Sequence, residues 1–385
     1  MHHSLRFEIL NRCATTHARC GRVTTPNGSF DTPAFMPVGT RASVKGLLPH
    51  EVAATGSQII LNNTYHLMLR PGEELIRRMG GVHRFMGWHG PILTDSGGYQ
   101  VFSLSHINRI DEDGVTFRSI IDGSPVRLTP ERSIQVQNAL GSDIIMAFDD
   151  CPPGTDPADG ISDTVRLSAA VDRTGRWLDR CAAAHERSRE QALFGIVQGG
   201  TDLALRSRSV EQVCSIDLPG YAIGGVAVGE GQEEIARIVT YTGPLLPADR
   251  PRYLMGVGYE RDILTAVRAG VDMFDCVLPT RNGRNGNAFT RSGQIRLRNA
   301  QYSEDQGPIE AGCDCRACAG GEFSRAYIRH LFISKEMLGP ILVSLHNIRH
   351  FQRLMLDIRT AIAEDGWLQL VEDWPVLAGD GSISA

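Results

Sequence analysis

Eight short apolar runs recur between residues 33 and 277, each ending in small or polar residues and most leading into a helix-like stretch. They are Pro33-Val38, Ser57-Leu61, Pro91-Thr94, Asp143-Phe148, Leu193-Val197, Tyr221-Ile223, Arg252-Met255 and Val271-Phe274. Apolar strands that alternate with helices form parallel sheets, because each crossover helix covers a face of the sheet. Eight such units predict an α/β fold of TIM type, a (β/α)8 barrel. An open doubly wound sheet has the same alternation and is the alternative.

Helix signals fall between these runs. In the stretch Thr129-Gly141, Thr129 is a capping residue, Pro130 suits the first turn and Glu131 favours the positive end of a helix. Further long helices are expected near Asp163-Ala184 and Glu260-Ala269. The intervals between the strands are therefore predicted to be helical crossovers.

Three cysteines lie close together in the C-terminal part: Cys313, Cys315 and Cys318 fall within six positions. Soft thiolates in a tetrahedral arrangement suit zinc, and three of them need one more ligand. We favour His346, because Asn347 follows it in a helix-like stretch that could return to the loop; His330 and His350 are competitors. Four protein ligands would close the coordination shell, so the predicted zinc ion is structural.

The stretch Arg281-Arg298 interrupts the strand and helix alternation just before the cysteines. We therefore predict that residues 1–385 form one barrel domain that contains a zinc-binding subdomain at about 285–350, followed by a closing C-terminal helix. A chain of 385 residues with 42% hydrophobic and 22% charged residues is long enough to bury the core of such a domain.

The compartment is expected to be the cytoplasm. Residues Met1 to Leu10 hold no apolar stretch of signal-peptide length, and no segment reaches the run of about 18 apolar residues that spans a membrane. The nine cysteines are scattered apart from the cluster, which indicates free thiols and a metal site rather than disulfides.

A net charge of −5 gives the chain no overall attraction for nucleic acid, so any such binding needs a local basic surface. One candidate lies between the last strand and the cysteines, where arginines are dense in a chain with two lysines. They are Arg281, Arg284, Arg291, Arg296 and Arg298. This strip is either a phosphate-binding surface or a solvated face.

Polar and small residues follow the predicted strands where the barrel would bring them to one face: Asp95, Asp149, Asp150, Gln198, Gly224, Gly225, Gly256 and Asp275. Single aspartates and glycines there are usually turn residues or helix caps, but four carboxylates at three strand ends favour an active site. The glycine pair after Ser96 permits close approach of a flat ligand, on which Tyr99 could stack. The sequence thus predicts a pocket for a planar, hydrogen-bonding ring.

Several blocks, read together, closely resemble the tRNA-guanine transglycosylases from about Phe7 to about Leu370. They are Thr94–Gln100 (TDSGGYQ), Met146–Cys151 (MAFDDC), Gly195–Gly200 (GIVQGG), Gly224–Glu230 (GGVAVGE), Tyr253–Gly258 (YLMGVG), Asp272–Arg281 (DMFDCVLPTR) and the cysteine cluster. The resemblance implies a (β/α)8 barrel with a zinc-binding insertion. It also implies exchange of guanine at the anticodon wobble position of G-U-N tRNAs (Asp, Asn, His, Tyr) for 7-aminomethyl-7-deazaguanine, on the route to queuosine.

The resemblance also implies roles for individual residues. Asp275 matches the nucleophile that attacks the ribose C1′ and forms a covalent tRNA-enzyme intermediate. Asp95 matches the general acid and base. Asp149 matches the carboxylate that binds the purine N1 and exocyclic amine. Further base-binding positions are Ser96, Gln198, Gly225, Tyr99, Met255, Cys151 and Val226, tRNA-binding positions are Thr280, Arg281 and Arg284, and the zinc ligands are Cys313, Cys315, Cys318 and His346.

Three positions bear on substrate choice. Cys151 resembles bacterial members that accept 7-aminomethyl-7-deazaguanine, whereas eukaryotic members, which take queuine, usually carry valine. Val226 stands where bacterial members usually have leucine, and Asp150 replaces the more usual glutamate. Bacterial members are generally homodimers that bind the tRNA anticodon stem-loop, so a homodimer is expected here.

Three other functions are weighed against the exchange enzyme. A noncatalytic tRNA-binding subunit would lack the full set Asp95, Asp149 and Asp275. An archaeal-type enzyme acting in the D-loop would carry additional C-terminal RNA-binding domains. A sugar-hydrolysing barrel with two carboxylates would explain neither the zinc loop nor the arginines.

Overall fold

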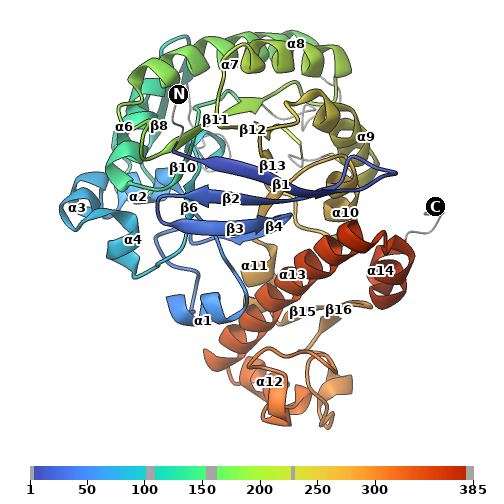
Figure 1. Cartoon of the computed structure of the whole chain (residues 1–385). Coiled ribbons are helices and arrows are strands. Elements are labelled where there is room, and N and C mark those ends of the chain that lie inside the picture. The colour runs from blue at the N-terminus through green and yellow to red at the C-terminus, as the bar shows by residue number, and fades with distance from the viewer. Residues whose placement is uncertain (1–3, 101–108, 153–162, 227–229, 379–385) are drawn as a thin grey trace.

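Eight parallel strands form the centre of the computed structural model, which describes residues 4–100, 109–152, 163–226 and 230–378 (Figure 1). Around the sheet their order is β4 (Ala34–Pro37), β14 (Met273–Cys276), β13 (Arg252–Leu254), β12 (Gly220–Ile223), β11 (Ala192–Val197), β10 (Ile144–Met146), β6 (Ile92–Thr94) and β5 (Ile60–Asn62). A parallel bridge between Val38 and Leu61 joins the two end strands and closes the barrel. The predicted (β/α)8 fold is thereby confirmed, and each of the eight predicted runs overlaps one barrel strand.

Alternation along the strands divides the apolar side chains between two cores. Ile144 and Met146 of β10 pack inside the barrel, whereas Ile145 between them packs outside under the helices. This follows from the two-residue period of a strand, and because both faces are covered the strands are apolar throughout.

The outer layer consists of helices that follow the strands. The longer ones are α6 (Pro130–Leu140), α7 (Thr164–Ala184), α8 (Leu203–Cys214), α9 (Gln232–Thr242) and α10 (Glu260–Arg268). The shorter ones are α1 (Pro49–Ala54), α2 (Thr64–Leu69), α3 (Glu73–Arg78), α4 (Gly81–Met86) and α11 (Leu278–Arg284). The Thr129 side chain accepts a hydrogen bond from the Arg132 amide, as the predicted cap requires, and α6 ends at Gly141 in the left-handed conformation.

An antiparallel sheet of β1 (Arg6–Arg12), β2 (Arg19–Thr25) and β3 (Gly28–Thr32) crosses the barrel, as Figure 1 shows. Val23 and Phe30 of this sheet join the inner core beside Met273, close to the N-terminal ends of the barrel strands. A second antiparallel sheet, β7 (Arg109–Asp111), β8 (Gly114–Arg118) and β9 (Pro125–Leu128), is inserted between β6 and α6. The N-terminal sheet fills one end of the barrel, and the opposite, C-terminal end is where side chains can converge on a ligand.

The C-terminal part begins with a hairpin of β15 (Asn287–Thr290) and β16 (Gly293–Arg296) and continues through the cysteine loop to α12 (Arg325–Ile333). Helix α13 (Leu338–Glu364) then runs from this region back to the barrel (Figure 1), where Phe351 stacks on Phe35 of β4 at 4.7 Å between ring centroids. Helix α14 (Trp367–Asp373) follows. One long helix therefore ties the cysteine loop rigidly to the barrel wall.

Within the described residues, no helix is long and apolar enough to cross a membrane.

Candidate active site and zinc centre

A cavity of about 460 Å³ opens at the C-terminal ends of the barrel strands. Its walls bring together residues from segments far apart in the sequence, including most of the predicted site. The predicted residues that line it are Asp95, Ser96, Tyr99, Asp149, Cys151, Gly225, Val226, Met255, Asp275 and Arg281. The fold thus assembles them into one concave site, which is the usual form of a small-molecule pocket.

Asp275 is held by one of its two carboxylate oxygens. The hydroxyl of Tyr253, on the neighbouring strand β13, donates to Oδ1 at 2.5 Å, and the Gly256 amide donates to the same oxygen at 2.8 Å. No described residue donates to Oδ2. Burial raises the pKa of Asp275, although both hydrogen bonds oppose the rise. The carboxylate is therefore fixed in orientation with one oxygen free to react.

Asp95 directly follows β6 and is held by the turn after β5. The Asn63 side chain donates to Oδ2 at 2.5 Å, the Thr64 amide to Oδ1 at 2.8 Å, and the Gln100 side chain to Oδ2 at 2.8 Å. Burial nevertheless raises the pKa of Asp95 to about 6, and the charge of Asp275 adds to the rise. A carboxyl with a pKa this close to neutrality can both give and take a proton.

Asp149 faces the same cavity from the end of β10. The Gln198 side chain donates to its Oδ2 at 2.6 Å and the Ser96 hydroxyl to Oδ1 at 3.2 Å. Burial raises the pKa of Asp149 to about 6 despite these bonds. Gln198 does not line the cavity, but its contact with Asp149 places it directly behind the wall.

The glycines after β12 are required by close contacts. Gly225 has a φ of +60°, and a Cβ atom there would lie 2.2 Å from Oε1 of Gln198. A Cβ on Gly224 would lie 2.7 Å from the Ile196 side chain. Only glycine lets this turn approach both Gln198 and the cavity.

The remaining lining residues provide the cavity's flat and apolar surfaces. Tyr99 is 47% exposed at the mouth, and Met255 is half-buried. Cys151 and Val226 are buried, and burial raises the pKa of the Cys151 thiol to about 12. Cys151 is therefore a neutral, compact wall residue rather than a thiolate nucleophile.

Asp150 does not share this environment. Its buried carboxylate turns to α7, where Arg166 binds both oxygens at 2.8 and 2.6 Å and Arg173 binds at 2.6 Å. Of the four carboxylates that follow predicted strands, Asp150 anchors a helix, and the other three line the cavity.

A positively charged cluster borders the mouth. Arg281 lines the cavity and Arg284 lies one turn further along α11. The loop before α1 adds Lys45, whose pKa is lowered by Arg284, by burial and by Arg41. These cations repel one another, and a phosphate group bound among them would relieve that repulsion.

Thr280, a predicted tRNA-binding position, and Arg291 of the predicted basic strip both have structural contacts. Thr280 is buried and its hydroxyl bonds to the Val277 carbonyl at 3.4 Å. Arg291 pairs with Asp357 at 3.0 Å and lies over the Trp374 ring at 4.8 Å. The described contacts thus make Arg291 a tie between the hairpin and the C-terminal segment.

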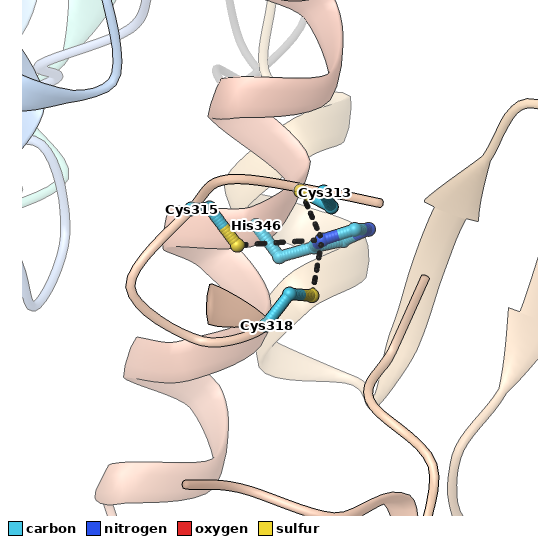
Figure 2. Close-up of side chains that lie close together, drawn as sticks. All are labelled: Cys313, Cys315, Cys318 and His346. Carbon is cyan, nitrogen blue, oxygen red and sulfur yellow. Dashed lines mark hydrogen bonds between the residues drawn. The ribbon is translucent and has the colours of Figure 1, made fainter. Parts of the chain in front are cut away.

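The three cysteines of the C-terminal loop surround one nitrogen of His346. Figure 2 shows the Sγ atoms of Cys313, Cys315 and Cys318 grouped around Nδ1, at 3.6, 3.6 and 3.4 Å. A tetrahedral zinc ion, bound to sulfur at about 2.3 Å and to nitrogen at about 2.0 Å, holds such atoms about 3.5 Å apart. The four side chains are buried and their ligand atoms lie within 4.8 Å of one another. They form a Cys3His zinc site.

The contacts around His346 support this assignment. Its Nε2 lies 2.7 Å from the Phe289 carbonyl, so Nε2 carries the proton and the lone pair of Nδ1 faces the thiolates. Asn347 beside it donates to the carbonyls of Pro279 and Asn287 and accepts from the Phe289 amide. The competitors are placed elsewhere: His350 bonds Glu260 at 2.8 Å, and His330 has its Nδ1 3.5 Å from the Ser334 hydroxyl.

Sequence reasoning missed several residues that shape the site. Asn63 and Tyr253 reach it only through the closure of the barrel, and nothing in their local sequence indicates this. Arg206 of α8, six residues after the Gln198-Gly199-Gly200 segment, was also missed.

Comparisons with known proteins agree with this geometry. A sequence model of one family, queuine tRNA-ribosyltransferase, matches residues 13–376. A queuine tRNA-ribosyltransferase of Synechococcus elongatus is 53% identical over 371 residues, covering 96% of this chain and 94% of the relative. One from Thermus thermophilus is 55% identical over 359 residues, with 93% and 90% covered. One from Bacillus mycoides is 51% identical over 362 residues, with 94% and 93% covered.

Proposed function

The chain belongs to the queuine tRNA-ribosyltransferase family and is thus a tRNA-guanine transglycosylase of queuosine synthesis, a pentosyltransferase; we propose that it inserts 7-aminomethyl-7-deazaguanine at the wobble position of G-U-N tRNAs. The tRNAs are those for Asp, Asn, His and Tyr. The observation that carries the chemistry is the free Oδ2 of Asp275 in a cavity that also holds Asp95 and Asp149.

The exchange is a double displacement. Oδ2 of Asp275 attacks the ribose C1′ and forms an ester bond as the bond from C1′ to guanine N9 breaks, and Asp95 gives a proton to the departing guanine. The incoming base then returns a proton to Asp95, its N9 attacks C1′, and the ester bond to Asp275 breaks. Both transition states resemble an oxocarbenium ion, and the two inversions give net retention at C1′. The raised pKa of Asp95, about 6, supports its part in both proton transfers.

Recognition of the base follows from the walls of the cavity. The Asp149 carboxylate accepts hydrogen bonds from the purine N1 and exocyclic amine, a pair of donors that adenine lacks. Ser96, Gln198 and the Gly225 main chain hold the remaining polar edge, and Tyr99 and Met255 lie against the two faces of the ring.

The 7-substituent is proposed to lie beside Cys151 and Val226. Cys151 is compact enough to leave room for an aminomethyl group, and both side chains are buried in the cavity wall. The proposed substrate is therefore the aminomethyl base and not queuine, with its larger cyclopentenediol.

The tRNA contributes a flipped base and a phosphate backbone. The wobble nucleotide has to leave its stack to reach a cavity of this depth. Thr280, Arg281 and Arg284 are proposed to hold the anticodon loop. The support is the group of cations formed by Arg281, Arg284 and Lys45.

Residues 1–385 act as one catalytic domain, in which the zinc-binding subdomain at about 285–350 supports the tRNA. The compartment is the cytoplasm, in keeping with the free cysteines of the described residues.

The enzyme acts as a homodimer. The support is the exposure of three apolar side chains on α12 and just before α13: Tyr327, Ile333 and Met337 are 40, 53 and 79% exposed. Sedimentation equilibrium of wild type and Met337→Glu tests it: a wild type that sediments as a monomer contradicts the dimer.

The proposed activity is tested by exchange of radiolabelled guanine into a purified tRNA with a G-U-N anticodon. Addition of 7-aminomethyl-7-deazaguanine should prevent incorporation of the label or displace it from the tRNA. The wild type is expected to label this tRNA and an otherwise identical tRNA with adenine at the wobble position is expected to stay unlabelled. Product analysis separates exchange from hydrolysis, because hydrolysis leaves an abasic site. An Asp275→Ala variant that exchanges at the wild-type rate contradicts the mechanism.

A further inference from the structure

Arg206 lies fully buried behind the base-binding wall of the cavity, in the first turns of α8. Its guanidinium donates to four main-chain carbonyls at the ends of two neighbouring strands. The acceptors and distances are Gly200 at 2.9 Å, Val197 at 3.2 Å, Gly224 at 2.7 Å and Gly225 at 2.8 Å. One side chain therefore fixes both loops that border the proposed base site.

The charge of Arg206 has an unusual environment. All of its hydrogen bonds go to main-chain carbonyls, and burial lowers its pKa to about 10. A group with that pKa is still protonated near neutrality. A complete positive charge thus lies directly behind the Gly224-Gly225 turn.

The carbonyl directions determine where the amides of the turn point. In a planar trans peptide the N–H points opposite to the C=O. Since the Gly224 carbonyl points at the guanidinium, the Gly225 amide points away from it, and Gly225 lines the cavity. This amide has no acceptor among the described residues. It is an unused donor that faces the ligand space.

The same helix face also positions Gln198. The Ser209 hydroxyl, three residues after Arg206 on α8, accepts a hydrogen bond from the main-chain amide of Gln198 at 2.9 Å. The Gln198 side chain then reaches Asp149 on one side and lies against Gly225 on the other. The Gln198 side chain is thus engaged with Asp149, and the Gly225 amide is the donor of this wall that remains for a planar ligand.

We propose that Arg206 is a positioning residue for carbonyl recognition: it holds the Gly225 amide so that this amide donates to the 6-oxo group of the base. The inference rests on the proposed function. Guanine that leaves C1′ carries negative charge that spreads onto this oxygen, and a donor fixed in advance, with a buried cation behind it, stabilises that charge most in the transition state.

The test compares guanine with 6-thioguanine, in which sulfur, a weaker acceptor, replaces only the 6-oxo oxygen and leaves the N1 and amine donors intact. Dissociation constants for both bases are measured by titration calorimetry in wild type, Arg206→Met and Arg206→Lys. The matched control is Arg208→Met: Arg208 lies on the same helix but bonds to Ser168 on α7. Thermal unfolding of each variant is recorded alongside.

The wild type and Arg208→Met are expected to bind guanine at least about tenfold more tightly than 6-thioguanine. In Arg206→Met the ratio of the two dissociation constants is expected to fall to within about twofold of one, because guanine binding weakens and 6-thioguanine binding changes little. In labelled exchange by Arg206→Met, kcat should fall by a larger factor than the KM for tRNA rises. A role limited to stability would lower the unfolding temperature and leave the ratio of the two constants unchanged, which overturns the proposal.

Two further outcomes keep the proposal open to refutation. If Arg206→Met does not fold, Arg206→Lys carries the test, since an ammonium group has three donors for four carbonyls and a partial loss of preference is expected. If neither variant folds, a wild type that binds guanine and 6-thioguanine equally tightly overturns the inference by itself. A wild type that prefers guanine but does not exchange it into tRNA refutes the proposed function and leaves the positioning role standing.

Discussion

The Tyr253 hydroxyl lies 2.5 Å from Oδ1 of Asp275 and, together with the Gly256 amide, occupies that oxygen. Tyr253 is 1% exposed, and burial followed by the charge of Asp275 raises its pKa well above the ordinary value. It therefore stays protonated and acts only as a donor. The pair determines which carboxylate oxygen remains available to a substrate.

Replacing Tyr253 by phenylalanine removes this donor and leaves the strand intact. A hydrogen bond to a charged group is worth about 1.5 to 3 kcal/mol, so kcat for guanine exchange is expected to fall by about 10- to 100-fold, with little change in the KM for tRNA. Because the bond lowers the pKa of Asp275, its loss moves the acid limb of the rate profile to higher pH. Steady-state exchange from pH 5 to 9 measures both effects.

Tyr221→Phe is the matched control for that variant. Tyr221 is also a buried barrel tyrosine, but its hydroxyl donates to the Ile216 carbonyl away from the cavity. Equal losses of kcat in the two variants would mean that Tyr253 acts through stability alone.

Binding of guanine is expected to weaken in acid because of Asp149. With its pKa at about 6, Asp149 loses its charge below that pH and can no longer accept both base donors. The dissociation constant for guanine should rise about tenfold for each pH unit below 6. Asp149→Asn should bind guanine weakly at every pH. Asp95→Asn should still show the rise of the dissociation constant below pH 6. A wild-type affinity that is constant from pH 7 to 4.5 contradicts the role of Asp149.

The free energy of unfolding is also expected to depend on the ionisation of Asp149. It should rise in acid, where the binding of guanine weakens. The folded pKa of Asp149, about 6, lies above the unfolded value of about 3.9, so the stability that its protonated form contributes is complete below pH 4 and is lost as pH rises through 6. Asp149→Asn should therefore exceed wild type in free energy of unfolding by about 1 to 3 kcal/mol at pH 8. Denaturant titrations at pH 8 and pH 4 measure this. The advantage should shrink at pH 4; an equal difference at both values rules out ionisation of Asp149 as its cause.

Zinc is expected to stabilise the C-terminal part of the chain. Cys318→Ala removes one thiolate from the Cys3His site and should lower both zinc content and the temperature of thermal unfolding. Cys214→Ala is the control, because Cys214 is a half-buried free thiol outside the cluster. Metal analysis of the two purified variants decides the matter: zinc retained at the wild-type ratio in Cys318→Ala counts against the ligand set.

The tRNA contacts predict a change in salt dependence. Arg281→Ala and Arg284→Ala should each raise the KM for tRNA and reduce the slope of log affinity against log salt by about 1, with the affinity for guanine unchanged. Arg237→Ala is the control, since Arg237 pairs with Glu234 on α9. Filter binding at several salt concentrations measures the slopes. Identical slopes in all four proteins would exclude contacts of Arg281 and Arg284 with phosphates.

The barrel was predictable because its strands are buried on both faces. Runs such as Asp143-Phe148 are almost wholly apolar, so they are visible without any knowledge of their partners. Local chemistry also predicted the cap at Thr129, which accepts a hydrogen bond from the first turn of its helix. These features depend on neighbouring residues alone.

The antiparallel sheets were not predicted, because their strands carry polar residues and obtain their stability from each other. Strand β1 has no buried residue, and it exists through its pairing with β2. The contacts that hold the site were hidden for the same reason: Tyr253 and Asp275 come from adjacent strands, and Arg206 reaches the turn after β12 from α8. Such contacts follow from the closed barrel and not from local sequence.

The most direct measurement is denaturing electrophoresis of the enzyme incubated with a G-U-N tRNA. The account predicts a shifted band of covalent tRNA-enzyme complex that disappears when guanine or 7-aminomethyl-7-deazaguanine is added before denaturation. Asp275→Asn should give no band, and peptide mapping of the wild-type complex should place the ribose adduct on Asp275. The control is Cys276→Ala, which removes the neighbouring thiol, held neutral because burial raises its pKa to about 12, and should keep the band. A band that persists in Asp275→Asn, or that is lost only in Cys276→Ala, would contradict Asp275 as the nucleophile.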